Sequence, residues 1–229
     1  MAGEGKGVVL LGFWPSLFAI KVKIALSEKH VDYEDREEDL SNKSDLLLKM
    51  NPVHKLIPVL IHDGRPVCES HIIIEYVDEV WNHGPTLLPA DPHERARSRF
   101  WADFADKKVI SSIRSVWYGK AEAQETAKKE LAEWVKLLES EIGEKAYFGG
   151  ETFGLLDLSL VPYYWWFLAL KKSLDLGPVC ELELPKLEEW LKRCLLRDSV
   201  NTALPDLDKL CKYIVQKREK RLAAAAPAN

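Results

Sequence analysis

The first third of the chain alternates short apolar runs with apolar residues at helical spacing, which is typical of an α/β domain. Val8–Leu11 has the length of a buried strand, and the apolar positions of Phe18–Leu26 recur on one face of a helix. We expect a second strand at Val31–Tyr33 and a short helix at Ser44–Lys49.

A hairpin and a further helix complete this expected domain. Pro58–Ile61 and Arg65–Cys68 flank the turn residues Asp63-Gly64, which predicts a strand, a turn and a strand. Ser70 then opens a helix with apolar residues through Val77. The order β-α-β-α-β-β-α is that of a thioredoxin-like domain, which we place at residues 1–82.

The pattern of apolar and polar residues changes after a proline-rich segment, residues 83–93, which we interpret as a linker. Strand-like alternation disappears, and helical spacing predicts helices at Glu94–Trp117, Ala121–Ile142, Leu155–Lys172, Pro185–Cys194 and Asp206–Arg221. The sequence therefore predicts an all-α second domain at residues 94–229. Its alanine-rich end, Leu222–Asn229, is expected to fray.

Composition and charge exclude several classes of function. The chain has 229 residues, 47% of them apolar, and a net charge of -4 with both signs interspersed. No basic face for nucleic acid is indicated. No apolar run approaches the roughly 20 residues that cross a bilayer, and Met1–Lys6 lacks the apolar core of a secretory signal. We expect a cytoplasmic protein without nucleic-acid or membrane partners.

The cysteines give no sign of a metal site or a disulfide framework. They lie far apart, without the short spacings of zinc ligands, at Cys68, Cys180, Cys194 and Cys211. We therefore expect reduced thiols and no bound metal.

Candidate chemistry begins at Trp14-Pro15-Ser16, where the first strand gives way to the first helix. Free N–H groups and the helix dipole favour an anion there. A serine hydroxyl can also donate a hydrogen bond to a thiolate. Lowering a thiol pKa by one unit needs about 1.4 kcal/mol, which these two effects can supply. Taken alone, Ser16 has the simpler interpretation of an N-cap.

Two other segments of the same domain fit the rest of a small peptide. If the Ile57-Pro58 bond is cis, its flanking backbone can pair with an extended peptide. Ser70, as the N-cap of its helix, would leave N–H groups free for a carboxylate, and Glu69 can hold an ammonium. Each feature has an ordinary structural interpretation, but their order and spacing point to one ligand.

These segments closely resemble the tau class of plant glutathione transferases. The likeness runs from about Val8 to Val215 and is carried by Phe13-Trp14-Pro15-Ser16, Asn51–Lys55, Ile57–Leu60, Cys68-Glu69-Ser70 and Phe148–Thr152 leading into Leu155-Leu156-Asp157. It implies the cytosolic glutathione transferase fold, an α/β thioredoxin-like N-terminal domain plus an all-α C-terminal domain. It also implies a homodimer, and glutathione as co-substrate with no other cofactor.

The resemblance assigns roles in glutathione binding. Ser16 matches the serine that stabilises the thiolate, and Glu69 with Ser70 matches the pair that binds the γ-glutamyl end. The remaining matches are Ile57 before Pro58, whose backbone pairs with the cysteinyl unit, and Lys43, which meets the glycine carboxylate.

Two positions depart from the family pattern. Leu56 stands where the family usually has a lysine, directly after Lys55. One contact to the glycine carboxylate should therefore be missing unless Lys55 or Lys43 reaches it, which weakens glutathione binding. Leu17 stands where the family often has proline, and we expect it to loosen the first helical turn and tilt the Ser16 hydroxyl.

The helical domain is expected to supply an apolar pocket for the electrophile. Trp117, Tyr118 and Trp165–Phe167 lie in helices that should face the cleft. The resemblance gives the lining residues as Phe13, Pro15, Ile110, Arg114, Trp117 and Trp166. Arg114 fits either an orienting role toward an anionic leaving group or a solvated helix position.

Several other residues have a structural interpretation. Asp157 is expected to cap the helix that follows Gly154. Trp134 and Trp190 are expected in the core.

The reaction predicted from these residues is conjugation of glutathione to apolar electrophiles, as in xenobiotic detoxification and stress response. Ser16 acts as a donor rather than a nucleophile, so no His-Asp partner is needed. Peroxidase action on organic hydroperoxides and non-catalytic storage of apolar ligands remain alternatives. Thiol transfer is disfavoured because those relatives carry a cysteine at the position of Ser16.

Overall fold

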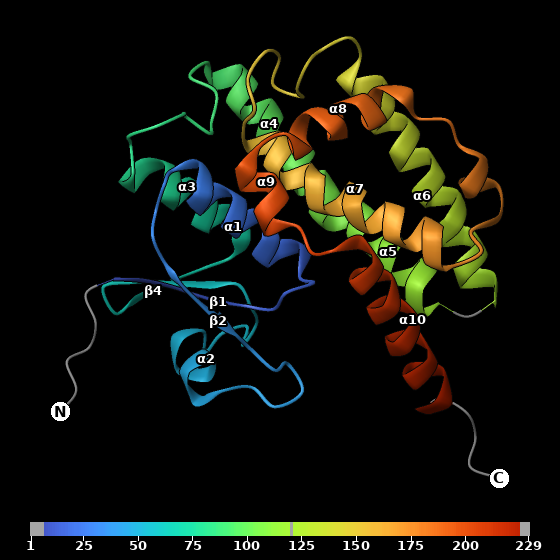
Figure 1. Ribbon diagram of the computed structural model, residues 1–229, viewed down its shortest axis with the longest axis horizontal. Coiled ribbons are helices and arrows are strands. Elements are labelled where there is room, and N and C mark those ends of the chain that lie inside the picture. The colour runs from blue at the N-terminus through green and yellow to red at the C-terminus, as the bar shows by residue number, and fades with distance from the viewer. Residues whose placement is uncertain (1–6, 120, 225–229) are drawn as a thin grey trace.

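The computed structural model describes residues 7–119 and 121–224 (Figure 1). Strands β1 (Val8–Gly12), β2 (Glu34–Glu37), β3 (Val59–His62) and β4 (Arg65–Cys68) form one sheet in the order β2-β1-β3-β4. β2 runs parallel to β1, whereas β3 and β4 are antiparallel to their neighbours. The hairpin predicted around Asp63-Gly64 is confirmed.

Three helices complete the predicted thioredoxin-like arrangement. Helices α1 (Leu17–Glu28) and α3 (Ser70–Val80) cover one face of the sheet, and the short α2 (Asp45–Met50) covers the other (Figure 1). The two faces are apolar because β1 and β3 alternate: Leu10 packs toward α1 and α3, and Leu11 toward α2.

The second strand lies further along the chain than predicted. Instead of Val31–Tyr33, the residues that pair with β1 are Glu34–Glu37, and all four are exposed. β2 is an edge strand, so it needs no apolar face and its charged side chains keep the edge from pairing with another chain. Apolar patterning could not locate it.

The helical domain begins with three consecutive helical segments. These are α4 (Pro92–Phe104), a π-helical segment (Ala105–Val109) and α5 (Ile110–Tyr118), where one uninterrupted helix was predicted. The other elements are α6 (Ala121–Ile142), α7 (Leu155–Ser173), a 3₁₀ turn (Gly177–Glu181), α8 (Pro185–Leu195), α9 (Asp198–Ala203) and α10 (Leu207–Ala224). The short α9 was not predicted. α10 continues to Ala224, beyond the predicted start of fraying; the rest of that segment, residues 225–229, lies outside the described residues.

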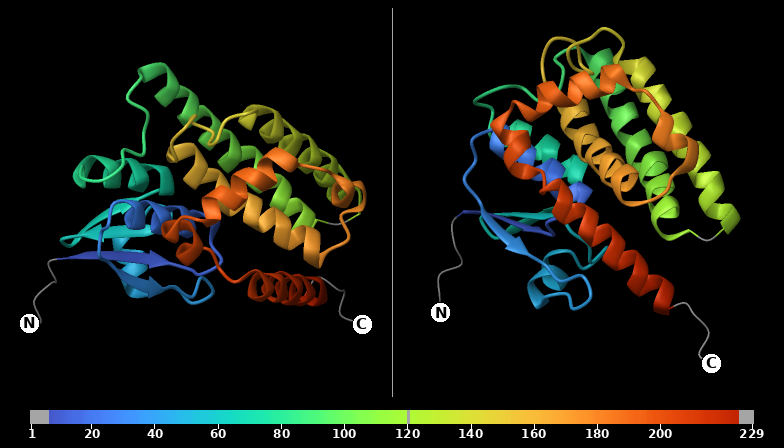
Figure 2. Two further views of the ribbon diagram at one scale, coloured as in Figure 1. Left: turned by 45° about the horizontal axis from the view of Figure 1, so that its top comes forward. Right: turned by 45° about the vertical axis from the view of Figure 1, so that its right-hand side comes forward.

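The two parts of the molecule pack closely together. α1 contacts α7 and α9, while α10 runs along α7 and α5 (Figure 2). None of the described helices combines the length and apolar character needed to cross a membrane.

Helix α1 carries charged side chains into this interface. The Glu28 carboxylate accepts hydrogen bonds from the Arg197 guanidinium, at 2.9 and 2.6 Å, and from the Ser199 hydroxyl. The Lys29 ammonium lies 2.6 Å from Asp78, which also accepts the backbone N–H groups of Leu87 and Leu88 in the linker. The end of α1 is thereby tied to α3 and to the α8–α9 junction.

The cap predicted at Asp157 is confirmed. Its fully buried carboxylate accepts the backbone N–H of Gly154 at 3.1 Å and of Phe148 at 2.9 Å, and the Trp190 indole N–H at 2.8 Å. Burial raises the pKa of Asp157 to about 6, opposed by these three donors. Trp190 is fully buried as predicted, whereas Trp134 is only partly buried.

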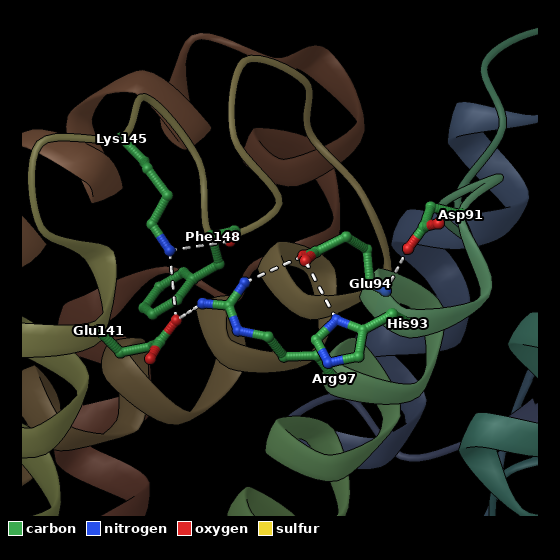
Figure 3. Close-up of polar contacts among 7 residues, drawn as sticks. All are labelled: Asp91, His93, Glu94, Arg97, Glu141, Lys145 and Phe148. Atoms are coloured by element: carbon green, nitrogen blue, oxygen red, sulfur yellow. Dashed lines mark hydrogen bonds and ion pairs between the residues drawn. The ribbon is translucent and has the colours of Figure 1, made fainter.

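An ion-pair network supports the loop around Phe148, whose backbone N–H binds Asp157 (Figure 3). The Arg97 guanidinium of α4 pairs with Glu141 of α6 and, at 3.1 Å, with Glu94. The Lys145 ammonium lies 3.2 Å from Glu141 and donates to the Phe148 carbonyl at 3.4 Å. The network is partly exposed, so its main effect is to hold the loop in place rather than to add much stability.

Replacement of Asp157 by alanine should destabilise the folded chain. It leaves three buried N–H donors without an acceptor, which lowers the free energy of unfolding by about 3–5 kcal/mol. Thermal melts and urea titrations measure the loss. Asp91→Ala is the matched control, because Asp91 caps α4 through the N–H of Glu94 at an exposed position and should cost only about 1 kcal/mol. Equal losses in the two variants would contradict the role of the buried network.

Candidate functional site

Ser16 stands at the junction of β1 and α1. Its backbone is extended, and its side-chain oxygen accepts the N–H of Ala19 at 3.3 Å, so Ser16 is the N-cap of α1. Among the described residues, no acceptor contacts the Ser16 hydroxyl, and its hydrogen is available to a ligand. The half-buried side chain thus combines a helix N-terminus with an unused donor.

The first turn of α1 is not loosened by Leu17, contrary to the sequence-based expectation. The Leu17 side chain is 5% exposed and packs into the core. The Ser16 carbonyl accepts the N–H of Ile20 at 2.9 Å, so the turn is closed. Burial of the Leu17 side chain holds the first turn of α1 in place, as the fixed φ of a proline would.

The start of α3 differs from the expected N-cap at Ser70. The cap position is Glu69, which makes no side-chain capping bond, and Ser70 is the first residue of the helix and is buried. Glu69 has a φ of 72°, a left-handed conformation that non-glycine residues adopt rarely and often at functional sites. The first N–H groups of α3 are therefore left uncapped by the Glu69 side chain, which is itself 57% exposed.

The loop before β3 is shaped by one buried amide. Asn51 accepts the N–H of His54 at 3.1 Å and donates to the Leu56 carbonyl at 2.9 Å. The Ile57-Pro58 bond that follows is cis. Lys55 and Leu56 are exposed on this loop.

Lys43 is half-buried and directly precedes Ser44, the N-cap of α2. The reach of Lys43 and Lys55 toward a glycine carboxylate stays a prediction.

A cavity of about 200 Å³ opens beside Ser16. It includes all six residues that the sequence placed in the electrophile pocket, and its lining is Phe13, Pro15, Ser16, Leu17, Phe18, Leu40, Ile110, Ile113, Arg114, Trp117, Trp166 and Tyr213. One wall comes from the β1–α1 junction and the other from α5, α7 and α10. The structure thus brings the Ser16 donor and an apolar, aromatic cavity together.

Two indoles fix the walls of this cavity. The N–H of Trp166 donates to the Pro15 carbonyl at 2.9 Å, which joins α7 to the residue before Ser16. The N–H of Trp117 donates to the Ile214 carbonyl at 2.9 Å, which joins α5 to α10. The two indole rings meet edge to face, with centroids 5.0 Å apart.

Some lining residues escaped the sequence analysis. Tyr213 of α10 packs its ring against Phe13 at 6.0 Å and Trp117 at 5.8 Å between centroids. Its only signal was an aromatic residue within an amphipathic helical pattern. Leu40 is 39% exposed and lies in the charged loop after β2, where a single apolar residue gives no periodicity.

Other expected aromatic residues lie elsewhere. Phe167 is buried in the helical core, and the Trp165 indole donates to the Pro205 carbonyl at 3.0 Å. Tyr118 stacks on Trp117 at 4.1 Å and does not line the cavity.

Three cations lie on or near the aromatic residues of this region. Lys209 lies over the Trp14 ring at 4.4 Å, and Lys217 over Tyr213 at 5.7 Å. Exposed Arg114 lines the cavity itself and makes no hydrogen bond or ion pair with the described residues. The cavity is therefore lined mainly by apolar and aromatic residues, with Arg114 as the one charged residue among the described residues that line it.

Comparison with known proteins identifies the family. The model for the glutathione S-transferase N-terminal domain matches residues 6–79, and that for the C-terminal domain matches residues 86–198. The chain belongs to the glutathione S-transferase family. It is 54% identical over 213 residues to glutathione S-transferase U25 of Arabidopsis thaliana, covering 93% of this chain and 96% of that protein.

Solved relatives agree with the tau class of this glutathione transferase. Rice GST1 (OsGSTU1), solved in complex with glutathione, is 40% identical with a TM-score of 0.85, and the match covers 96% of this chain and 99% of that one. The tau-class enzyme of mango, Mangifera indica, is 38% identical with a TM-score of 0.84, covering 93% and 100%.

Removal of the Trp166 indole N–H should impair catalysis beyond its effect on stability. Trp166→Phe keeps an aromatic ring but frees the loop before Ser16, and we expect kcat to fall about tenfold. Trp165→Phe is the control, since it removes the same type of bond outside the cavity. Steady-state kinetics and thermal melts of both variants separate the effects. Equal kcat values in the two variants would contradict the link between Trp166 and Ser16.

Proposed function

We propose that this transferase binds glutathione as its thiolate at Ser16 and transfers it to apolar electrophiles held in the adjoining cavity. The observation that carries the proposal is the free Ser16 hydroxyl at a helix N-terminus, next to a cavity walled by Trp117, Trp166 and Tyr213. Donor and cavity come from different parts of the chain and meet at one point.

The reaction needs no covalent enzyme intermediate. The Ser16 hydroxyl donates to the sulfur, and the α1 dipole favours its negative charge. The thiolate attacks an electrophilic carbon and forms a C–S bond, and a leaving group departs with the electron pair of the broken bond. In an addition, the pair moves to the neighbouring atom, which takes a proton from water. Arg114 in the cavity lining can hold an anionic leaving group.

The rest of glutathione extends along the first domain in this proposal. The α-carboxylate of the γ-glutamyl unit meets the uncapped start of α3 at Ser70, and its ammonium meets Glu69. The backbone of Ile57, before the cis Pro58, pairs with the cysteinyl unit. Lys43 and Lys55 attract the glycine carboxylate. The solved rice relative, which contains glutathione, supports this binding.

We also propose a homodimer. Where α3 and α4 meet, Ile72 and Phe100 are 58% and 62% exposed, and the Arg99 guanidinium binds Glu75 through two bonds of 2.8 and 2.6 Å. Apolar side chains around an ordered ion pair suit an interface with a second copy. Sedimentation analysis of wild type and Phe100→Asp measures the oligomeric state.

The tau-class likeness supports a cytoplasmic detoxification role toward foreign or stress-derived electrophiles. The carrier and peroxidase alternatives have no specific structural observation in their favour. Conjugating activity of the wild-type chain tests the carrier alternative, because storage requires no transfer. Hydroperoxide reduction uses the same thiolate, so it is tested by assaying the wild-type chain with an organic hydroperoxide beside chlorodinitrobenzene.

Ser16→Ala should lower kcat/KM for conjugation to chlorodinitrobenzene roughly tenfold to a hundredfold, the worth of one charge-assisted hydrogen bond. Glutathione should still bind. A pH titration of the ultraviolet absorbance of the bound thiolate should give a higher apparent thiol pKa than in wild type. Ser16→Thr retains a hydroxyl and should retain most activity. Wild-type kinetics in the alanine variant would overturn the thiolate role of Ser16. A wild-type chain that binds glutathione and an apolar dye but has no conjugating activity would instead favour storage.

Leu56→Lys should strengthen glutathione binding by restoring a cation near the glycine carboxylate. An exposed ion pair contributes up to about 1 kcal/mol, so the KM for glutathione should fall by up to about fivefold. The matched control is Leu48→Lys, which adds the same charge to an exposed leucine of α2. If both variants lower the KM equally, long-range attraction rather than a local contact explains the effect.

A further inference from the structure

A fully buried lysine lies little more than one helical turn beyond Ser16 on α1. The Lys21 ammonium pairs with the Asp106 carboxylate, and lies 3.4 Å from the Tyr163 hydroxyl and 3.5 Å from the His71 ring nitrogen Nε2. Its side chain is 0% exposed, and the rings of Phe18 and Tyr163 flank its charge at 5.3 and 4.6 Å. The proposed chemistry does not use this charge.

The groups around Lys21 come from both parts of the molecule. Asp106 lies in the π-helical segment between α4 and α5, and Tyr163 of α7 donates to the same carboxylate at 2.5 Å. His71 of α3 directly follows Ser70, and its Nε2 lies 3.6 Å from Asp106 and 3.5 Å from the Ser159 hydroxyl. One ion pair therefore connects α1 and α3 to the helical domain.

The groups around the Lys21–Asp106 ion pair are neutral hydrogen-bonding partners. Burial lowers the pKa of the Lys21 ammonium, and the adjacent Asp106 carboxylate opposes this change. Burial and the Lys21 ammonium lower the pKa of His71 to about 4, so its ring is neutral. Burial and Asp106 raise the pKa of Tyr163 well above its usual value. The neutral His71 and Tyr163 groups act as hydrogen-bonding partners, which makes the arrangement directional.

Each end of the cluster leads to a part of the site. Phe18 contacts the Lys21 charge and also lines the cavity beside Ser16. The π-helical segment of Asp106 runs directly into α5, which carries Ile110 and Arg114 on the opposite cavity wall. π-Helical insertions frequently occur at functional sites, because they shift the face that the following helix presents.

We propose that Lys21 is a positioning residue for glutathione transfer. Its ion pair with Asp106 holds the beginnings of α1 and α3, with Ser16 and Ser70, in register with the acceptor wall on α5. Apolar contacts alone permit small sliding between packed helices, whereas a hydrogen-bonded ion pair specifies one arrangement. The inference rests on the proposed function of Ser16 and concerns the geometry of transfer, not the binding of glutathione.

The C-cap residue of the same helix offers a matched control. Lys29 forms a buried ion pair with Asp78 at 2.6 Å, but both residues belong to the first domain and neither lines the cavity. Lys29→Met therefore removes a comparable pair from the end of α1 without freeing the two walls of the site from each other.

The test compares Lys21→Met, the double variant Lys21→Met/Asp106→Leu, and Lys29→Met. Thermal melts, kcat with chlorodinitrobenzene, and the Kd of glutathione are measured for each. Lys21→Met should lower kcat roughly tenfold or more while the Kd changes less than about threefold. The double variant replaces the pair by apolar side chains, which often restores stability. It should recover the melting temperature but not kcat.

Two results would overturn the positioning role. One is a double variant that regains wild-type kcat, and the other is Lys29→Met losing as much kcat as Lys21→Met at equal loss of stability. If Lys21→Met does not fold, the double variant carries the comparison alone. An inactive wild-type enzyme would instead contradict the proposed transfer at Ser16, so the two failures are distinguishable.

Discussion

Helix α1 and its C-cap residue bury three charged side chains, Lys21, Glu28 and Lys29. Each must be paired because an uncompensated buried charge is strongly destabilising. Asp106 of the π-helical segment meets the middle of the helix, and Asp78 with the α8–α9 junction meets its end. These pairings fix α1 between the sheet and the helical bundle. The position of Ser16, at the start of the same helix, follows from them.

The site is therefore a property of an interface. The first domain supplies an activating donor and a helix dipole, but no enclosed apolar space at that point. The helical domain supplies the aromatic walls. The Trp166 indole N–H donates a hydrogen bond to the carbonyl of Pro15, the residue directly before Ser16. A change in the packing of α7 or α10 can thus alter the fit of an acceptor without touching the groups that bind glutathione, which suits a family whose members share one nucleophile.

The sequence predicted those elements and site residues that apolar periodicity or the spacing of neighbouring residues identifies. Apolar runs located β1 and β3, and the spacing of Gly154 and Asp157 located a helix cap. The charged β2 carries no apolar signal, and the backbone alone decides its pairing. Lys21 looks like a solvated residue in an apolar helix, because its partner is 85 positions away. Tyr213 and Leu40 reach the cavity only through tertiary packing, so local patterns could not assign them.

The long separations of these partners also bear on how the protein is made. Arg197 and Ser199 follow Glu28 by 169 and 171 positions. Once residues 1–82 have left the ribosome, Lys29 can pair with Asp78, but Lys21 and Glu28 still lack Asp106, Arg197 and Ser199. The contacts that cover these two charges therefore form only after the helical domain has been made. The helical domain is thus part of what makes the first helix of the other domain a stable buried element.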